Sequence, residues 1–488
     1  MANFADLLTK ETSWSRTANG AVCLDKTGDA LLDLYATIGA LRSATLERKY
    51  KLFDAAVAED AELAAKILFY ARDVREGLGE RNTFRELLAY AANNYSYIVT
   101  PNIPLIGFYG RYDDLYFLIG TPCEDQMWTY MKEQFTKDYM NMLDKKPCSL
   151  LAKWIKTPDA SSPTTRRLGI LTSQKLGFAN VGAFKRKLKA LRKYLDIVEI
   201  KISANEFDTI AYEKVPSNAM TKYRSLFAAK DNERFAQYLN DVTSGKAEIK
   251  ANTLYPYDIV QKILRGERND VLEAQWKALP NYVKEGDNIL IMADVSGSMT
   301  CCNSLPMASS VGLAIYFAER ATGVFHNKFM TFSSRPELVS LSGATLYQKV
   351  RNAENADWRM NTDLAAAFEV ILDTAVRNRV SASDIPKALV IISDMQIDYC
   401  TNNKETFYDV YAKQFAAAGY PMPNVIFWNV NSESNAFHAD KGARGVQYLS
   451  GHSATSFKAL IEGLEMTPYQ AMIKTITSER YDLVTIAK

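Results

Sequence analysis

The stretch NILIMADVSGS, residues 288–298, decides the fold class of this chain of 488 residues. It begins with a short apolar run of strand length, and an aspartate, two serines and a glycine follow almost at once. A strand that is apolar along its length is typical of a parallel sheet that helices cover on both faces. In such sheets ligands bind beyond the carboxyl ends of the strands, so the polar residues of this stretch mark a candidate site.

The residues that follow alternate between short apolar runs and segments of helical periodicity. We predict strands at residues 327–332, 388–392, 424–430 and 446–449. We predict helices at residues 308–319, 363–375, 408–417 and 456–464. This alternation predicts a doubly wound parallel sheet, Rossmann-like in architecture, over residues 286–466. Residues 467–488 are expected to form one more helix and a short tail that pack back on the helical region.

Before the decisive stretch, residues 1–285 have the pattern of one helix after another. Apolar residues recur there at three- and four-residue steps, which predicts helices with one buried face. The predicted helices are residues 30–41, 46–57, 62–74, 83–93, 126–143, 165–176, 183–194, 219–228 and 234–242. Short loops between helices predict stacked hairpins, either a HEAT-like α-solenoid or a large bundle. No strict repeat fixes the period, and whether the helices close into a ring stays open.

Side-chain oxygens at three strand–helix boundaries predict a divalent-cation site. The candidate ligands are Asp294, Ser296, Ser298, Thr362 and Asp394. Gly297 lets the first loop curl tightly, so that its three oxygens can converge on one point. The last aspartate ends the predicted strand at residues 388–392, which could neighbour the first strand of the sheet. Oxygen ligands of this kind suit Mg²⁺ or Mn²⁺.

Composition and charge argue against several other kinds of site and of protein. The three histidines lie far apart, which argues against a zinc site, and the net charge of +2 points to no class of partner. No run of eighteen apolar residues appears, so no membrane span is expected. The six cysteines show no CxxC pair. Together with the absence of a signal peptide, this predicts a reducing, cytoplasmic environment.

The order of the candidate ligands resembles the metal-ion-dependent adhesion site of von Willebrand factor A domains. The resemblance implies that Ser296 and Ser298 bind the metal directly, and that Thr362 alternates between direct and water-mediated contact. It implies that Asp294 and Asp394 act mainly through water, and that an acidic group of a protein partner completes the shell. The loop before the threonine reads WRMN instead of being glycine-rich, and here the chain departs from the family.

A helical region that precedes such a domain resembles the Ro-like family, whose TROVE module is an RNA-binding ring of helical repeats. Six strings resemble more closely an uncharacterised family with a helical N-terminal region joined to a von Willebrand factor A domain. They are ARDVREGLGERNTFRELL (71–88), SLLAKWIK (149–156), KVPSNAMTKY (214–223), DWRMNTDL (357–364), SDMQID (393–398) and TPYQAMIKTI (467–476). The resemblance to the Ro-like family implies a structured RNA, or one with a single-stranded end, as the partner.

The densest basic segment is KRKLKALRKY, residues 185–194, on one predicted helix. We call five of its basic residues, together with two arginines shortly before it, the basic stripe. The stripe consists of Arg166, Arg167, Lys185, Arg186, Lys189, Arg192 and Lys193. Positions three and four residues apart share one side of a helix, so these cations could contact phosphates. Nearby aromatics such as Tyr194 could stack on bases. The competing interpretation is an ordinary solvated helix face.

Three functional hypotheses follow. The first is a non-enzymatic Ro-like RNA-binding protein whose A domain holds a divalent cation for an acidic protein partner. The alternative is a Mg²⁺-dependent protein-interaction scaffold that does not bind RNA. The third, a phosphotransfer enzyme with Asp294 as nucleophile, is disfavoured because such enzymes carry a second carboxylate two residues later, where this chain has Ser296.

Two further motifs have plain structural interpretations. GLGER, residues 77–81, lacks the Lys-Ser or Lys-Thr of a phosphate loop and follows no strand, so we interpret it as a turn between helices. Cys301 and Cys302 lie just beyond the predicted cation loop, and we interpret them as small buried thiols rather than as a redox pair.

Overall fold

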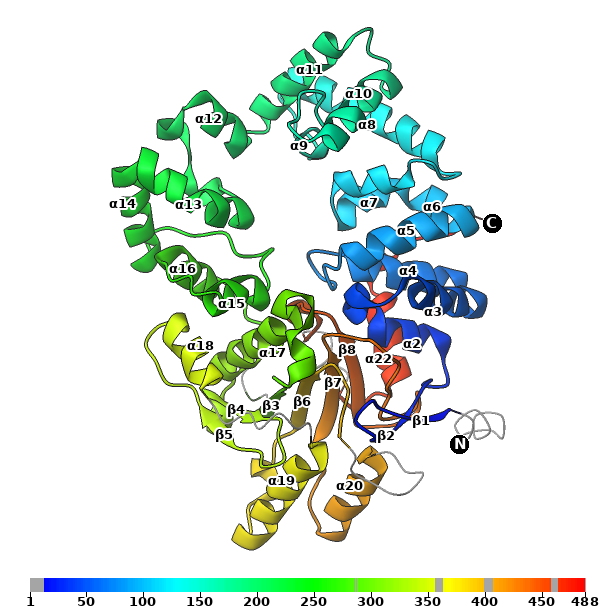
Figure 1. The fold of residues 1–488 in the computed structure, drawn as a ribbon, viewed down its shortest axis with the longest axis vertical. Helices are drawn as coiled ribbons and strands as arrows, with labels where there is room; N and C mark the ends of the chain where they lie inside the picture. The colour runs from blue at the N-terminus through cyan, green and yellow to red at the C-terminus, as the bar shows by residue number, and fades with distance from the viewer. Residues whose placement is uncertain are drawn as a thin grey trace.

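The computed structural model describes residues 13–284, 286, 288–355, 363–398, 407–457 and 464–487. As predicted, a helical N-terminal region precedes an α/β region built on a mostly parallel sheet. The helices rise from one side of the sheet, turn back at the far end of the molecule and return to the other side (Figure 1). Together with the sheet they outline a ring. We call the two limbs the ascending arm and the returning arm.

The ascending arm consists of short helices, and three of them begin at a capping side chain. Its helices are α2 (Ala30–Thr37), α3 (Leu46–Glu59), α4 (Ala61–Arg72), α5 (Asn82–Asn94), α6 (Ser96–Val99) and α7 (Ile103–Tyr109), with the 3₁₀ segments η1 (Ile38–Ser43), η2 (Thr100–Asn102) and η3 (Tyr112–Leu118). Thr45 accepts a hydrogen bond from the Arg48 amide and begins α3, and Asp60 accepts one from the Leu63 amide and begins α4. These caps satisfy amides that would otherwise lack partners at the starts of these two helices.

The turn and the returning arm complete the helical region. They contain α8 (Glu124–Leu143), α9 (Leu151–Trp154), α10 (Pro163–Lys175), α11 (Val181–Tyr194), α12 (Val198–Ala204), η4 (Phe207–Thr209), η5 (Tyr212–Lys214), α13 (Ser217–Lys230), α14 (Asn232–Thr243), α15 (Pro256–Leu264) and α16 (Asp270–Lys277). The nine helices predicted from periodicity correspond to α2–α5, α8, α10, α11, α13 and α14, with ends shifted by a few residues. The prediction missed the shorter helices α6, α7, α9 and α12, and also α15 and α16, which connect the returning arm to the sheet.

The six-stranded sheet has the order β5-β4-β3-β6-β7-β8. Its strands are β3 (Ile289–Ala293), β4 (Lys328–Thr331), β5 (Leu338–Ser340), β6 (Ala388–Ser393), β7 (Asn424–Asn429) and β8 (Val446–Ser450). The pairings among β4, β3, β6, β7 and β8 are parallel, and the edge strand β5 is antiparallel to β4. The sheet connections reverse direction between β3 and β6, where ligands bind in this class of fold.

Helices cover both faces of the sheet. They are α17 (Cys301–Arg320), α18 (Leu346–Glu354), α19 (Leu364–Asn378) and α20 (Phe407–Ala417), with the 3₁₀ segments η6 (Gly297–Thr300), η7 (Gly323–Phe325), η8 (Ala382–Asp384) and η9 (Ala454–Ser456). The helix that contains residues 297–320 is long and apolar enough to span a membrane, but 72% of its most apolar window is buried within the protein. It therefore serves as a core helix between the sheet and α15. The helix predicted at residues 456–464 falls mostly on residues outside the described ranges.

The two faces of the sheet belong to two different hydrophobic cores, because successive side chains of a strand point to opposite faces. Ile289 and Ile291 pack in one core with α15–α18 of the returning arm and its continuation. Leu290 and Met292 pack in a larger core with α19, α20 and the helices of the ascending arm. The sheet thereby joins the bases of the two arms.

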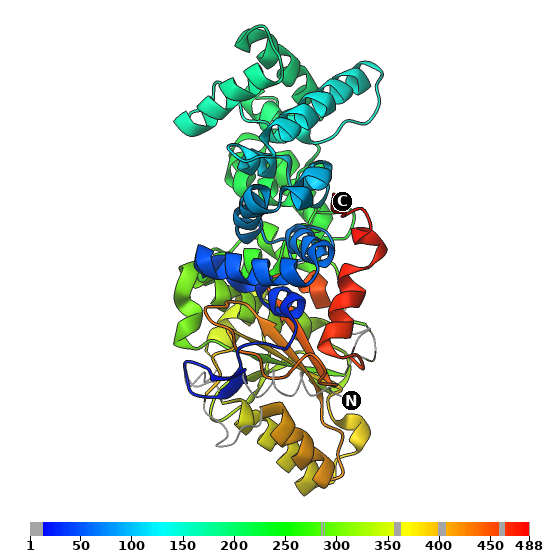
Figure 2. The ribbon, with the colours of Figure 1, turned by 90° about the vertical axis from the view of Figure 1, so that its right-hand side faces the viewer.

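Both ends of the described chain reinforce this junction. A hairpin of β1 (Trp14–Arg16) and β2 (Val22–Leu24), which periodicity did not predict, lies against the α/β region through bridges at Asp398 and Phe437. Near the other end, α22 (Pro468–Ile476) and η10 (Glu479–Tyr481) run along the ascending arm (Figure 2). The Ala487 amide donates a hydrogen bond of 2.9 Å to the Tyr97 carbonyl of that arm.

Candidate nucleic-acid interface and cation site

A cavity of about 930 Å³ lies between the two arms of the ring. Residues from the ascending arm, from the turn around α9 and α11 and from the returning arm all contribute to its wall. Their positions in the sequence run from Arg42 to Asp258. The ring thus brings together side chains that are separated by more than two hundred residues, and only the closed arrangement creates this cavity.

The ring closes where the loop between α4 and α5 meets the segment that begins α15. Gly79 lies so close to Tyr255 that a Cβ atom at position 79 would come within 1.6 Å of the Tyr255 hydroxyl oxygen. Beside this contact, the Arg42 guanidinium forms an ion pair with Glu80 at 2.6 Å. The ring of Tyr257 packs edge-on against His452, which follows β8, with 5.3 Å between centroids. The GLGER motif is therefore a turn, as predicted, and it also seals the ring.

The wall of the cavity is strongly basic. Its basic side chains are Arg42, Arg72, Arg75, Arg81, Arg111, Lys153, Arg192 and Lys222. Its acidic side chains are Glu199 and Asp258. Clustered lysines and arginines with few acids nearby are the electrostatic pattern of a polyanion site.

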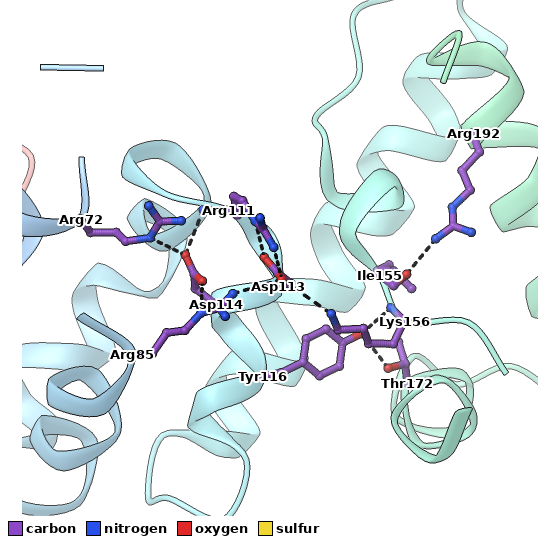
Figure 3. Close-up of polar contacts among 10 residues, drawn as sticks. All are labelled: Arg72, Arg85, Arg111, Asp113, Asp114, Tyr116, Ile155, Lys156, Thr172 and Arg192. Carbon is purple, nitrogen blue, oxygen red and sulfur yellow. Dashed lines mark hydrogen bonds and ion pairs between the residues drawn. The ribbon is translucent and has the colours of Figure 1, made fainter. Parts of the chain in front are cut away.

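Two buried aspartates at the start of η3 fix the positions of the central arginines (Figure 3). Asp114 accepts from the Arg72 Nε at 2.7 Å and from the Arg85 Nε at 2.6 Å. Asp113 accepts from the Arg111 Nε at 2.9 Å and forms an ion pair with Arg85 at 3.1 Å. These cations lower the pKa of Asp113 to about 2 although burial opposes ionisation. The Asp113 carboxylate is therefore charged at neutral pH, and the two aspartates together hold the guanidinium groups in place.

Arg81 differs from its neighbours because it has no carboxylate of its own. Within the described part of the chain its guanidinium forms no hydrogen bond and no ion pair. Its pKa lies below the usual arginine value, because burial and the nearby charges of Arg111, Arg85 and Arg72 all oppose its own charge. An anion placed beside Arg81 would relieve this repulsion.

Aromatic side chains interleave with the basic ones. Phe108, Trp154, Tyr255 and Tyr257 line the cavity. The Arg111 guanidinium lies over the Trp154 ring at 4.0 Å from its centroid. Phe108 is 41% exposed, which leaves part of its ring free. Basic groups and aromatic faces in one groove are the two elements with which proteins bind single-stranded nucleic acids.

The basic stripe predicted from the sequence lies mostly elsewhere. Lys185, Arg186, Lys189 and Lys193 are exposed on α11, and none of them lines the cavity. Lys185 forms an ion pair with Asp159 at 2.8 Å. Arg166 and Arg167 on α10 are exposed as well. The structure does not bring these residues together with the cavity wall.

Arg192 is the member of the stripe that reaches the cavity. Its guanidinium donates to the carbonyls of Ala152 and Ile155, both at 2.8 Å, so it also fixes the end of α9. The sequence signal that was overlooked is the string ARDVREGLGERNTFREL, which carries Arg72, Arg75, Arg81 and Arg85 within fourteen residues. Loop and helix ends place these four side chains around one region of the ring.

The candidate cation site lies at the switch point of the sheet. β6 pairs in parallel with β3, as predicted, so Asp294 and Asp394 follow neighbouring strands. Asp294 is fully buried and accepts from the Ser296 amide at 2.8 Å. The hydroxyls of Ser296 and Ser298 are 3.1 Å apart. Four of the five predicted ligands therefore gather at one edge of the sheet, and the fifth, Thr362, lies outside the described residues.

The oxygen groups present fit a hard cation. Burial, together with the charge of Asp394, raises the pKa of Asp294 to about 6. Burial likewise raises the pKa of Asp394, and Glu433 adds to the effect. Among the described residues no basic side chain forms an ion pair with either aspartate, so a divalent cation would neutralise two buried carboxylates. Ser393, which sequence reasoning missed, donates to Asp294 at 2.6 Å and orients it.

Carboxylates alone do not define this site. No group of three or more histidine, cysteine, aspartate or glutamate side chains suited to a metal occurs in the portion of the chain that the structure describes. The donors at the switch point are two carboxylates and neighbouring hydroxyls, a set that favours Mg²⁺ or Mn²⁺ over zinc.

The vicinal thiols Cys301 and Cys302 lie just beyond the cation site. Cys301 is half-buried and Cys302 is exposed, so the prediction that both are buried is wrong.

Comparison with known proteins divides the chain as the fold does. Residues 288–483 match the model of a domain of unknown function, DUF7788, and residues 17–108 and 148–289 match a second such model, DUF2828. The chain is 26% identical to the uncharacterized protein L728 of Acanthamoeba polyphaga mimivirus, over 95% of this chain and 87% of that protein. The crystal structure of the Deinococcus radiodurans Ro (RSR) protein aligns with a TM-score of 0.39 and 15% identity, over 92% of this chain and 93% of that one.

Proposed function

We propose that this protein is a non-enzymatic, Ro-like RNA-binding protein that holds a single-stranded end of RNA in the cavity of its ring. The basic wall of the cavity carries the proposal: eight basic and two acidic side chains line it. Phosphates neutralised by such a wall release counterions, which gives binding that weakens steeply as salt rises.

Single-stranded RNA suits this cavity better than a duplex. The aromatic faces of Phe108 and Trp154 can stack only on bases that are not already paired and stacked with one another. Pairing within a duplex would leave the RNA backbone as the main contact and these rings unused. A structured RNA with an unpaired end would place that end in the cavity and keep its helix outside.

For the α/β region we propose a second role, in which Mg²⁺ or Mn²⁺ binds at the switch point and recruits an acidic protein partner. The buried Asp294 and the paired hydroxyls of Ser296 and Ser298 support this role, because they offer oxygen ligands without a competing cation. The proposal includes no catalytic step, since Ser296 occupies the position where a phosphotransfer enzyme carries its second carboxylate. Free thiols at five described cysteines fit the cytoplasm as its compartment.

The test of RNA binding is fluorescence anisotropy with a hairpin RNA that bears a single-stranded 3′ end. Titrations at several salt concentrations, each with Mg²⁺ and with EDTA, separate the two regions. We expect salt-sensitive binding that survives EDTA, and much weaker binding of the same hairpin with a blunt end. Absence of binding at low salt would reject the proposal and favour the alternative, a Mg²⁺-dependent protein-interaction scaffold.

The test of the cation site is the shift in thermal unfolding that MgCl₂ produces. The wild-type protein should unfold at a higher temperature with Mg²⁺, because a ligand that binds the native state stabilises it. Ser296→Ala should abolish this shift without unfolding the protein. Ser334→Ala, an exposed serine that follows β4, is the matched control and should leave the shift unchanged. Equal shifts in both variants would place the cation elsewhere.

A further inference from the structure

The arginines around η3 form a cluster with more positive than negative charge. Five cationic side chains meet there: Arg72, Arg81, Arg85, Arg111 and Lys156. Two carboxylates, those of Asp113 and Asp114, lie among them, so five positive charges oppose two negative ones and three remain uncompensated. Asp114 is fully buried and Asp113 is 5% exposed, and neither lines the cavity, whereas Arg72, Arg81 and Arg111 do.

Most of these cations cannot move away from one another. Arg111 lies between Asp113 on its edge and the Trp154 ring on its face. Arg72 is fully buried and its Nε bonds Asp114. Lys156 lies 3.6 Å from Asp113 on the opposite side (Figure 3). Because the positions are fixed before any ligand arrives, an anion would gain their attraction without ordering these side chains.

Arg81 completes the cluster on the side of the cavity. It is exposed to the cavity, whereas Arg72 and Arg85 are buried or nearly so. Asp113 offsets its charge only from a distance, and because no described side chain forms a hydrogen bond or an ion pair with it, its five N–H donors are free for a ligand. Planar guanidinium groups bind phosphate oxygens in pairs, and several that converge on one point can surround a phosphate.

We propose that this cluster binds the terminal phosphate of a single-stranded RNA, with Arg81 as the residue that contacts it. The inference rests on the proposed function and adds the kind of RNA end that the cavity prefers. A terminal phosphate carries nearly two negative charges at neutral pH and three free oxygens. An internal phosphodiester carries one charge and two free oxygens. It would therefore be attracted less strongly by a cluster with three surplus positive charges.

The experiment compares three versions of one short single-stranded RNA, with a 5′-phosphate, with a 3′-phosphate, or with hydroxyls at both ends. Anisotropy titrations with the full chain should show about tenfold tighter binding of one phosphorylated version over the hydroxyl version. In Arg81→Gln this preference should fall below about twofold, because the free guanidinium supplies the contact. The version that is preferred identifies the end that enters the cluster.

Arg75→Gln is the matched control, because Arg75 lines the same cavity and is exposed but is not part of the cluster. This variant should bind all three RNAs more weakly and keep the tenfold preference. Equal affinity of the wild-type protein for the three RNAs would overturn the inference and leave RNA binding intact. A preference that persists in Arg81→Gln would overturn the assignment to Arg81. Failure of all three RNAs to bind would reject the proposed function together with the inference.

Discussion

Two regions of this molecule are rich in basic residues, but they differ in where these residues come from and in how firmly their side chains are held. The exposed stripe on α11 gathers its cations within one helix, where solvent surrounds Arg186, Lys189 and Lys193. The cavity wall gathers its cations from many separate segments and fixes several of them on the buried carboxylates of Asp113 and Asp114. The stripe carries charge on mobile side chains, whereas the wall holds charge in fixed positions beside aromatic faces.

The difference shows why density of charge along a sequence is a poor guide to a binding site. A solvated lysine loses little by staying in water and gains little from a phosphate at moderate salt. Arg111 stacks on Trp154 and donates a hydrogen bond to Asp113, so its side chain has already lost conformational freedom in the folded protein. Its contact with a ligand is therefore less costly in entropy. The predictions below separate the two regions, from the largest expected effect to the smallest.

The largest effect should follow the removal of a carboxylate that holds the wall together. Asp114→Ala leaves the buried Arg72 without its carboxylate partner and Arg85 with Asp113 alone, and we expect the free energy of unfolding to fall by about 4 kcal/mol. Asp144→Ala is the control, because the ion pair of this exposed aspartate in the described part of the chain is with the exposed Lys146, at 3.1 Å. Urea unfolding measures both. Equal stability of the two variants would show that the wall needs no buried anion.

A somewhat smaller loss should follow an added methyl group at the contact that closes the ring. Gly79→Ala places a Cβ atom within 1.6 Å of the Tyr255 hydroxyl oxygen, and we expect a loss of about 3 kcal/mol in stability. Gly266→Ala is the control, because it also has a positive φ, of +90°, but nothing within 4 Å of the added atom. Thermal unfolding should separate the clash from backbone strain. Matching unfolding temperatures would mean that the contact at position 79 does not hold the arms together.

A still smaller effect, on binding alone, should distinguish the aromatic residues of the two regions. Trp154→Ala should weaken binding of single-stranded RNA about tenfold. One stacked base contributes about 1–3 kcal/mol to the free energy of binding, and we expect a value in the lower half of that range. Tyr194→Ala, at an aromatic side chain of α11 that is 39% exposed, should leave the affinity unchanged. Anisotropy titrations compare the two. A larger effect at Tyr194 would move the interface to the outside of the ring.

The strands of the sheet could be predicted from the sequence because most of them are buried on both faces. β3, β6, β7 and β8 lie within one or two residues of their predicted ranges. β5 escaped prediction because its three residues, Leu338–Ser340, are largely exposed and carry little pattern. The three-residue strands β1 and β2 were missed as well, since their pairing depends on contacts with distant parts of the chain.

The two candidate sites differ in how far a sequence can reveal them. Asp294, Ser296 and Ser298 lie within five residues, and the motif predicted their convergence before the fold was known. The cavity has no such motif, because Arg72, Arg81 and Arg111 come from three separate segments of the ascending arm, and the other wall residues come from the turn and the returning arm. Their arrangement depends on the buried aspartates, whose role is invisible until burial is known.

The measurement that tests the account most directly compares two variants that each lose three positive charges. One variant carries Arg75→Ala, Arg81→Ala and Lys153→Ala in the cavity, and the other carries Arg186→Ala, Lys189→Ala and Lys193→Ala on the stripe. Anisotropy with a single-stranded RNA should show about 100-fold weaker binding for the cavity variant at about 0.1 M salt, with the salt slope reduced by about 2. The stripe variant should bind like the wild-type protein. Full affinity in the cavity variant and loss in the stripe variant would contradict the account.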